Sequence, residues 1–297
     1  MSDQLIYLNG KFVPKEKAVV SVYDHGFLYG DGVFEGIRVY EGNVYKLTEH
    51  VDRLYESAHS IMLTIPHTKE KIQEIIIDTV NKNNFSSAYI RVVISRGAGD
   101  LGLDPRNCAE PTIIVIAEPL AIYSDALYKK GLKVASVANR RSSPDVLNPQ
   151  IKSLNYLNNI LVKLSSIQSD ADEALILNNQ GYVTEGSADN IFIIKNGIIK
   201  TPPVYLGALE GITRSAIIEI IRENGYALEE VPFTLHDVYI ADEVFLTGTA
   251  AEVIPVVTVD NRQIGTGKPG EITNQLLQAF RKKTLTDGIR CYVEEKV

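Results

Sequence analysis

The order of strand-like and helix-like segments in the first 120 residues restricts the fold more than any other feature. Gly-containing turns at Asn9-Gly10 and Glu41-Gly42-Asn43 separate short apolar runs, which predicts two β-hairpins. Two segments with apolar residues at helical spacing follow, and we expect Thr48 and Thr68 to cap these helices. Apolar runs at 88–95 and 112–118 then predict two strands. Strands and helices grouped in this way are typical of an α+β (mixed α/β) domain, not of a doubly wound parallel sheet.

The rest of the chain predicts a second, larger domain. We place a small α+β domain at 1–120, an interdomain linker at 121–130 and a large domain at 131–297. The large domain is expected to contain a strand at 132–139, a helix at 154–169, hairpin strands at 174–178, 181–185, 190–194 and 198–200, a helix at 213–224, strands near 227–233, 243–247 and 253–259, and a helix at 270–283.

Composition excludes several classes of partner. Lys and Arg number 30 against 37 Asp and Glu, a net charge of −7, and they form no basic run. Such a chain is not expected to bind nucleic acid or a membrane surface, so small-molecule substrates are the predicted partners. No apolar run approaches the roughly 20 residues of a membrane span, and the N-terminus lacks a signal-peptide pattern, so we expect a cytoplasmic protein. Two cysteines and five histidines without ligand spacing predict no disulfide framework and no metal site.

Two glycine-rich segments resemble nucleotide-binding loops but have the wrong context. Gly97–Gly102 matches G-x-G-x-x-G after a strand, yet Pro105 and Pro111 prevent the helix that a dinucleotide site requires. Gly265–Lys268 is followed by Pro269 where a phosphate loop needs Ser or Thr. We therefore interpret both segments as turns.

Four other segments carry groups that suit one kind of chemistry. Lys152 lies at an expected strand-to-helix junction, next to a predicted inward row that includes Leu157, Ile160 and Leu164, and partial burial would favour its neutral, imine-forming amine. On that helix, Tyr156 would lie one turn from Lys152. Glu185 ends a strand in a segment of small residues, where another group can approach its carboxylate.

The remaining two segments, with one arginine, suit a phosphate. Gly211-Ile212-Thr213-Arg214 opens a helix, and Thr247-Gly248-Thr249-Ala250-Ala251 ends a strand in small residues, so both can present backbone amides to an anion. Arg53 has the fork geometry for a phosphate, although it could instead form an exposed ion pair with Glu49. A lysine, a carboxylate, amide nests and an arginine together are what pyridoxal 5'-phosphate requires.

With these segments in view, the chain resembles the branched-chain amino acid aminotransferases, which are fold type IV pyridoxal-phosphate enzymes. The likeness covers essentially the whole chain, because five motifs occur in the family's order: Val33–Arg38, Ile151–Tyr156, Glu185–Asn190, Gly211–Arg214 and Gly248–Glu252. It implies a small α+β domain and a larger β-barrel-like domain with flanking helices. It also implies transamination of Leu, Ile and Val with 2-oxoglutarate, and a homo-oligomer that is a dimer or an assembly of dimers.

The resemblance also implies a role for each matching residue. Lys152 would bind the cofactor covalently and, once freed, move a proton from the substrate α-carbon, while Glu185 would pair with the pyridine nitrogen and Tyr156 with the ring's 3-oxygen. The phosphate would be held by Arg53 and the amides at Ile212, Thr213 and Thr249. The substrate pocket would be lined by Phe34, Tyr89 and Arg91, with the Thr249–Ala250 turn receiving the substrate carboxylate and Tyr29 and Tyr123 contributing beside a dimer interface.

Other functions stay open at this point. Relatives of the same fold include D-amino-acid transaminases, aminodeoxychorismate lyases and R-selective amine transaminases. A nucleotide-dependent oxidoreductase using the Gly97–Gly102 loop and a non-enzymatic small-molecule binding protein are alternatives from other classes.

Overall fold

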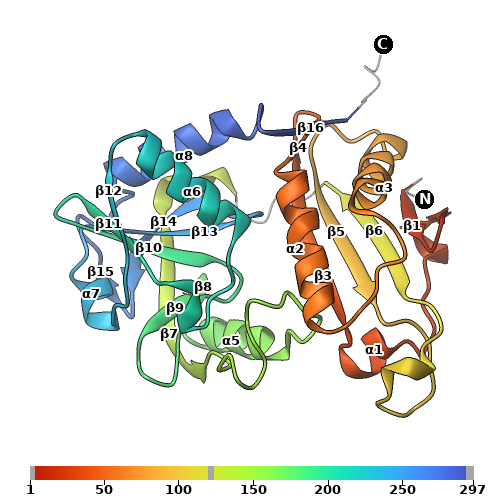
Figure 1. The fold of residues 1–297 in the computed structure, drawn as a ribbon. Helices are drawn as coiled ribbons and strands as arrows, with labels where there is room; N and C mark the ends of the chain where they lie inside the picture. Colours follow the sequence, from red (N-terminus) through yellow and green to blue (C-terminus); the bar gives the residue numbers. More distant parts are fainter. Residues whose placement is uncertain (1–3, 120–123, 292–297) are drawn as a thin grey trace. The chain divides into compact units, whose positions relative to one another are not determined.

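The computed structural model describes residues 4–119 and 124–291 and divides into two compact units (Figure 1). The first unit comprises Met1–Leu120, Ile151–Asn155 and Thr284–Val297, and the second comprises Ala121–Gln150 and Tyr156–Lys283. This division differs from the linear one expected from the sequence, because two later segments return to the first unit. In addition, part of the expected linker is the helix α4, Asp125–Lys130, which belongs to the second unit.

The first unit is a seven-stranded antiparallel sheet with two helices on one face (Figure 1). The strand order is β16-β4-β3-β5-β6-β1-β2. Its elements are β1 Leu5–Leu8, β2 Lys11–Pro14, η1 Lys15–Lys17, α1 His25–Tyr29, β3 Gly32–Tyr40, β4 Asn43–Tyr45, α2 Leu47–Ser60, α3 Lys69–Lys82, β5 Ala88–Ser95, η2 Pro105–Asn107, β6 Thr112–Glu118 and β16 Gly288–Arg290.

Both expected hairpins of this sheet are confirmed. Asn9 and Gly10 have φ of 46° and 86°, so the β1–β2 turn needs two left-handed residues in succession. Glu41 and Gly42, at 47° and 77°, make the same kind of turn between β3 and β4. Consecutive positive φ values match the twist of paired strands, which explains why Asn-Gly is a reliable hairpin signal.

Of the two predicted helix caps, the one at Thr68 is confirmed and the one at Thr48 is wrong. Thr68 caps α3 as expected, and its hydroxyl accepts a hydrogen bond from the Lys71 backbone N–H at 3.3 Å. The expected cap at Thr48 is wrong, because α2 begins at Leu47 after Lys46 in a left-handed conformation. Leu47 is fully buried, so core packing places the first turn of the helix instead of a side-chain cap.

Residues of β3, β5 and β6 alternate between two environments. One side of β3, with Val33, Ile37 and Val39, packs into the core with α2 and α3. The opposite side of this strand carries Phe34, Gly36 and Arg38, and the register pairs Gly36 with Arg91 and Arg38 with Tyr89. The sheet face away from the helices therefore holds the aromatic and cationic residues of β3 and β5.

The second unit is a nine-stranded mixed sheet that curls on itself, with the main path β12-β11-β10-β13-β14-β7-β8-β9. Along this path β9 and β10 are far apart, yet they are consecutive in the chain and the Gly186 N–H donates to the Asp189 carbonyl at 2.6 Å. This confirms a barrel-like sheet. Its elements, besides α4, are β7 Leu132–Arg140, α5 Leu157–Gln168, β8 Glu173–Leu177, β9 Val183–Gly186, β10 Asn190–Lys195, β11 Ile198–Thr201, η3 Val204–Leu206, α6 Ile212–Glu223, β12 Ala227–Glu230, α7 Leu235–Tyr239, β13 Glu243–Gly248, β14 Glu252–Val259, β15 Arg262–Gln263 and α8 Glu271–Lys283.

The helix α5 packs with the opposite face from the one expected. The row predicted to point inward is exposed, and the inward face instead carries Asn159, Val162 and Ser166. Val162 is the apolar residue of this face, and it joins a small core cluster with Val137, Ala174 and Ile176. An apolar periodicity shows only that a helix has an apolar side, and the same pattern arises whether that side meets the core or another surface. The exposed row is Leu157, Ile160, Leu161, Leu164 and Ile167.

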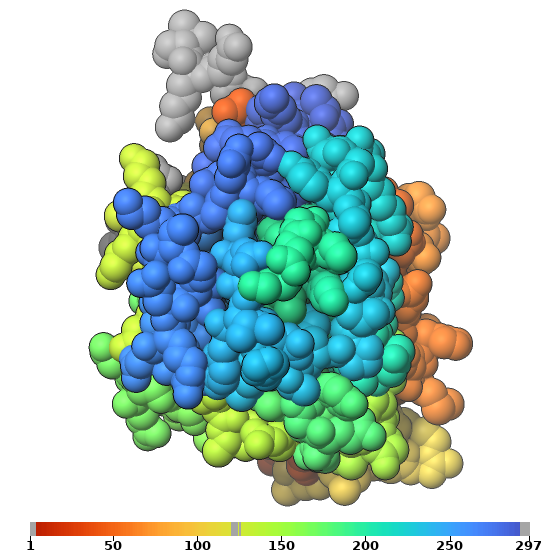
Figure 2. Space-filling model, turned by 90° about the vertical axis from the view of Figure 1, so that its left-hand side faces the viewer, coloured from red at the N-terminus to blue at the C-terminus, as the bar shows by residue number. Residues whose placement is uncertain are grey.

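Helices α6 and α8 contact each other and the strands β13 and β14. On the face shown in Figure 2, the blue segments that include α8 lie beside the cyan segments that include α6. In the part of the chain that the structure describes, no helix combines the length and apolarity required to span a bilayer. Among those same residues, no group of three or more His, Cys, Asp or Glu side chains is placed to hold a metal ion.

Candidate functional site

Lys152 lies on an extended segment paired with β3. The Phe34 N–H donates to the Lys152 carbonyl at 3.0 Å, and the Leu154 N–H donates to the Gly32 carbonyl at 2.9 Å. Ser153 forms an antiparallel bridge with Val33. These bonds use the backbone groups that a helix would need, so α5 begins only at Leu157.

The expected helical relation between Lys152 and Tyr156 is therefore wrong. Residues 151–155 are not helical and belong to the first unit, whereas Tyr156 is the N-cap residue of α5 in the second unit. The expected junction at Lys152 is thus a segment joined to β3 by an isolated antiparallel bridge, and the sequence pattern gives no sign of this pairing.

Three of the residues expected to line a substrate pocket gather around Lys152 in the first unit. The Lys152 Nζ lies 4.7 Å from the centroid of the Phe34 ring, and the Arg91 Cζ lies 4.5 Å from the same centroid. The Arg91 guanidinium also donates to the Tyr89 hydroxyl at 3.3 Å. A Cβ at Gly36 would lie 2.0 Å from the Tyr89 hydroxyl, so only glycine leaves room for this tyrosine. The group therefore combines an amine, a guanidinium and two aromatic rings.

Arg53 is part of a buried charge network on the helix-covered face of the same sheet. Its Nε and Nη2 donate to the two oxygens of Glu35 at 2.7 and 2.9 Å, and His50 Nδ1 lies 2.8 Å from Glu35 Oε2. Glu35 is fully buried and Arg53 is 9% exposed. The alternative ion pair of Arg53 with Glu49 is not formed, since Glu49 pairs with Lys46. A bidentate carboxylate fixes the plane of the guanidinium.

The network perturbs both of its titratable members. Burial alone would raise the pKa of Glu35, but the Arg53 and His50 side chains together hold that pKa well below its usual range. Burial lowers the pKa of His50, and the charges of Arg53 and Lys152 lower it further, against the effect of Glu35. Glu35 is therefore a charged carboxylate and His50 a neutral ring at neutral pH.

The helix α2 also connects this network to the lysine segment. His50, Arg53 and Ser57 lie on one face of the helix at spacings of three and four residues. The Lys152 backbone N–H donates to the Ser57 hydroxyl at 3.1 Å. One helix face thus holds both the lysine backbone and the oriented arginine.

Of the two tyrosines expected beside an interface, Tyr29 and Tyr123, the structure describes only the first. Tyr29 ends the short helix α1, is 38% exposed, and donates its hydroxyl hydrogen to the Leu101 carbonyl at 2.6 Å. It therefore contacts the Gly97–Leu103 loop, which opens no helix, as the interpretation of that segment as a turn requires. The second residue, Tyr123, lies outside the described residues.

Glu185 lies at the centre of a buried network in the second unit. It is 5% exposed, and its Oε1 pairs with the Arg141 Nη2 at 2.6 Å. Its Oε2 accepts hydrogen bonds from the Leu209 N–H at 2.9 Å and from the Asn190 amide at 3.3 Å. Arg141 reaches the Asn159 side chain of α5 at 3.3 Å. A buried guanidinium and two neutral donors compensate a carboxylate that would otherwise be costly to bury.

Arg141 and Asn190 were missed as functional residues by sequence reasoning. Arg141 follows Arg140 at the end of β7, and two adjacent arginines give no sign of which one is buried. Asn190 ends the Glu185–Asn190 motif, and the sequence assigns it no role of its own. Its amide bonds Glu185 and the Leu209 carbonyl, and a Cβ at Gly211 would lie 2.1 Å from its Oδ1.

The two segments expected to present amides have suitable backbones. Helix α6 begins at Ile212 after Gly211, which provides no side-chain cap, and Thr213 in its first turn is buried. The turn with Thr249 and Ala250 joins β13 to β14, and a Cβ at Gly248 would lie 2.0 Å from the Asp189 Oδ1. Backbone N–H groups at a helix start and at a tight turn are typical anion ligands.

Comparisons with known proteins agree with this fold. The family model described as amino-transferase class IV matches residues 32–259. A protein of Methanocaldococcus jannaschii is 52% identical over 289 residues, which cover 97% of this chain and 99% of that protein. The Escherichia coli branched-chain amino acid aminotransferase structure has a TM-score of 0.92 at 34% identity, over 99% of this chain and 97% of that one.

A further solved structure is described with a bound compound. The T.th. branched-chain amino acid aminotransferase, complexed with N-(5'-phosphopyridoxyl)-L-glutamate, has a TM-score of 0.90 at 38% identity, over 95% of this chain and 94% of that one. The family match covers well over half of this chain, and the M. jannaschii relative aligns along 99% of its own length. The resemblance expected from the motifs is thus confirmed, and the chain belongs to the amino-transferase class IV family.

Proposed function

We propose that the protein is a branched-chain-amino-acid aminotransferase that uses pyridoxal 5'-phosphate. It transfers the amino group of L-leucine, L-isoleucine or L-valine to 2-oxoglutarate, giving branched 2-oxo acids and L-glutamate. The neighbour solved with N-(5'-phosphopyridoxyl)-L-glutamate carries the cofactor and one expected product in a single compound, which is the observation that supports this reaction most directly. Similarity at 34–38% identity over nearly whole chains supports the same substrate class.

The residues of this chain fit the proposed cofactor. Lys152 supplies a primary amine beside an aromatic ring, and Glu185 supplies a buried carboxylate. Gly211 and Gly248 occupy positions where a Cβ would collide with Asn190 and Asp189, so glycine lets these two side chains pack directly against both amide segments. When bound, pyridoxal 5'-phosphate supplies an aldehyde that condenses with amines and an electron-poor ring that draws electrons from the substrate α-carbon.

In this proposal Lys152 holds the cofactor and then acts through its Nζ as the base and acid that moves the α-proton. Glu185 would pair with the ring nitrogen, and Tyr156 would hydrogen-bond the 3-oxygen. The phosphate would be held by Arg53 and by the backbone N–H groups of Ile212, Thr213 and Thr249. Support for the first assignment is the proximity of Lys152 to Phe34 and Arg91. The role of Glu185 is supported by its hydrogen-bond donors, Arg141 and the Leu209 N–H, which compensate the charge of the buried carboxylate.

Substrate recognition is proposed for the face of the first sheet that lies away from its helices. Phe34 and Tyr89 offer apolar surface for a branched side chain, and Arg91 offers a guanidinium for the second carboxylate of glutamate. Tyr29 and Tyr123 are kept as further contributors, and the turn at Ala250 as the receiver of the α-carboxylate. A pocket of this composition accepts both an aliphatic and an acidic side chain.

Self-association is part of the proposal. The exposed row of α5, defined by Leu157, Ile160, Leu161, Leu164 and Ile167, is a continuous apolar stripe at helical spacing. A second copy of the chain is the proposed occupant, giving a homodimer or an assembly of dimers. We also propose a cytoplasmic location, for which the unpaired Cys108 and Cys291 give support.

A borohydride experiment tests the cofactor assignment. The purified protein should show a yellow absorption band that borohydride bleaches, and the Lys152 peptide should gain the mass of the reduced cofactor. Lys152→Ala should lose both signals and its turnover, whereas Lys69→Ala, an exposed lysine on α3, should keep them. Transamination at the wild-type rate by Lys152→Ala would refute the assignment.

A substrate panel tests the specificity. L- and D-amino acids are assayed against 2-oxoglutarate, and we expect Leu, Ile and Val to be the best donors. A preference for D-alanine would contradict the substrate assignment and leave the cofactor assignment intact.

A further inference from the structure

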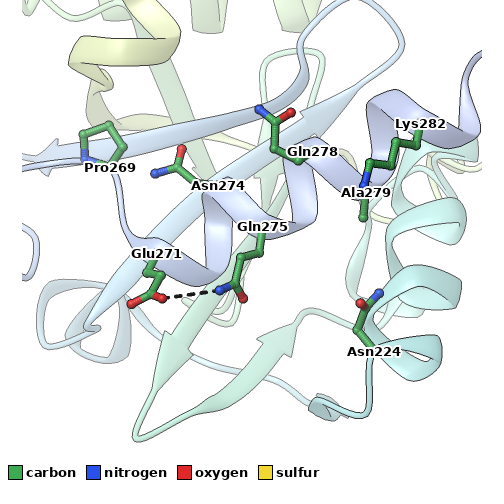
Figure 3. Close-up of a pocket in the computed structure, with 8 residues that line it drawn as sticks. All are labelled: Asn224, Pro269, Glu271, Asn274, Gln275, Gln278, Ala279 and Lys282. Atoms are coloured by element: carbon green, nitrogen blue, oxygen red, sulfur yellow. Dashed lines mark hydrogen bonds between the residues drawn. The ribbon is translucent and has the colours of Figure 1, made fainter.

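A hollow of about 790 Å³ lies on the second unit between α4 and α8, and neither Lys152 nor Glu185 is among its lining residues. Figure 2 shows the yellow-green segment that includes α4 beside the blue C-terminal segments. A neighbouring hollow on α8, drawn in Figure 3, shares Pro269, Asn274 and Gln278 with it. Both hollows therefore open along the same helix.

The lining of the α4–α8 hollow is unusually basic for this protein. Lys129, Lys130, Lys268 and Arg281 line it, and none of its lining residues is acidic. None of the side chains that the structure describes forms an ion pair with these three lysines, whereas Arg281 pairs with Glu252. Three clustered lysines raise the local positive potential of a chain whose net charge is −7, and they attract anions.

Polar and apolar groups complete this lining. The amides of Asn274 and Gln278, whose side chains are drawn on α8 in Figure 3, can donate and accept hydrogen bonds. Leu277 and Pro269 add apolar surface. In the neighbouring hollow, Glu271 is hydrogen-bonded to Gln275 at 3.4 Å. The α4–α8 hollow therefore suits a small organic anion better than a bare inorganic ion.

Two contacts connect the hollow to the turn between β13 and β14. The Tyr128 hydroxyl donates to the Ala251 carbonyl at 2.9 Å, and the Arg281 Nε donates to the Glu252 Oε2 at 2.7 Å. The Arg281 guanidinium lies 5.0 Å from the centroid of the Tyr128 ring, so these two side chains are in contact beside the turn. Glu252 is buried with φ of 56°, a conformation that a non-glycine residue keeps only when its surroundings hold it.

We infer that the α4–α8 hollow is a second ligand site, which binds a small molecule carrying at least two negative charges as phosphate or carboxylate groups. An anion there competes with Glu252 for Arg281. Because Arg281 and Tyr128 support the turn that holds Thr249 and Ala250, binding weakens the hold of that turn on the substrate carboxylate. The effect of the anion on substrate binding rests on the proposed function, whereas the binding of the anion to the hollow does not.

Calorimetric titration of the purified holoenzyme tests the binding step. Pyrophosphate and citrate are the probes, at constant ionic strength with sodium chloride as the blank. Saturable binding of pyrophosphate alone identifies a phosphate site, and saturable binding of citrate alone identifies a carboxylate site. In the double variant Lys130→Gln/Lys268→Gln we expect at least a tenfold loss of affinity. The matched double variant Lys11→Gln/Lys17→Gln, which removes the same charge from exposed lysines of the first unit, should bind as the wild type does.

Steady-state kinetics test the coupling. A saturating probe should raise the KM for the amino-acid donor about fivefold in the wild type and leave it unchanged in the Lys130→Gln/Lys268→Gln variant. No saturable binding, or equal binding by both double variants, would overturn the site. Binding without a change in KM would overturn the coupling. A protein that binds the probes but lacks transamination would overturn the proposed function and leave the site standing.

Discussion

Replacing Glu35 with glutamine tests whether the buried charges of α2 depend on this carboxylate. Glu35 receives two hydrogen bonds from Arg53 and lies 2.8 Å from His50. Glutamine has the same shape but no charge, and its amide nitrogen would face donors where an acceptor oxygen now lies. The variant leaves the Arg53 guanidinium buried without its counter-ion.

The expected loss is large because the site is buried. Removing one partner of a buried ion pair costs about 3–5 kcal/mol, since the remaining charge stays desolvated. For a unit of this size that corresponds to a fall in melting temperature of roughly 6–20 °C. Glu49→Gln on α2 is the matched control, because Glu49 pairs with Lys46 at the surface, where ion pairs contribute about 0–1 kcal/mol.

Urea unfolding, followed by circular dichroism, measures both variants against the wild type. The pH dependence gives a second readout with a definite sign. The pKa of Glu35 is lower in the folded protein than its ordinary value of 4.5, so its stabilising contribution is complete above pH 4.5 and is lost as the pH falls through the folded pKa. Within that window the loss approaches about 1.4 kcal/mol per pH unit.

The difference between wild type and Glu35→Gln should therefore be constant near neutral pH and shrink below pH 4.5. His50 also has a lowered pKa, so its neutral form stabilises the fold above pH 6.5 and both proteins lose this contribution on acidification. A Glu35→Gln protein no less stable than Glu49→Gln, or a difference that grows below pH 4.5, would refute the reasoning.

Three further variants test other parts of the structure. Gly36→Ala places a Cβ 2.0 Å from the present position of the Tyr89 hydroxyl, so we expect KM for the amino donor to rise about tenfold with little loss of stability, and initial-rate kinetics check this. Arg141→Leu leaves Glu185 buried without its guanidinium, so unfolding free energy should fall by about 3–5 kcal/mol and the cofactor absorption band should shift or disappear. Leu161→Asp on the exposed row of α5 should lower the oligomeric state in sedimentation velocity, and an unchanged state would argue against that row as the contact between copies.

Sequence patterns predict the bounds of strands, helices and turns correctly where interactions between nearby residues determine the structure. The strands β5 and β6 have the predicted bounds, because both are rich in β-branched residues, which favour extended backbone. The helix α3 begins after Thr68, since its hydroxyl bonds the first turn directly. The hairpins at Asn9 and Gly42 follow from residues that tolerate positive φ. In each of these cases the stabilising contact lies within a few residues.

The sequence does not predict local structure correctly where contacts with a segment far away in the chain determine it. Lys152 was expected at the end of a strand leading into a helix, but its backbone pairs with β3, more than 100 residues earlier in the chain. The start of α2 at Leu47 is set by burial in a core assembled from several strands. Arg141 and Glu185 are separated by over 40 residues, and no periodicity shows that they meet. The motifs identified the chemical groups, whereas the ion pairs that hold these groups required the structure.

The helix α5 shows how the two kinds of failure are connected. Its inward face carries Asn159, whose amide donates to the Ser187 carbonyl at 2.6 Å and whose oxygen accepts from Arg141 at 3.3 Å. A helix that turns an amide inward to support a buried carboxylate network must turn its apolar row outward, because one helix cannot bury both sides in the same core. The exposed row carries five large apolar side chains, and covering apolar surface contributes about 25 cal/mol per Å². The helix orientation that supports Arg141, and through it Glu185, therefore also presents the row that we propose as the contact between copies of the chain.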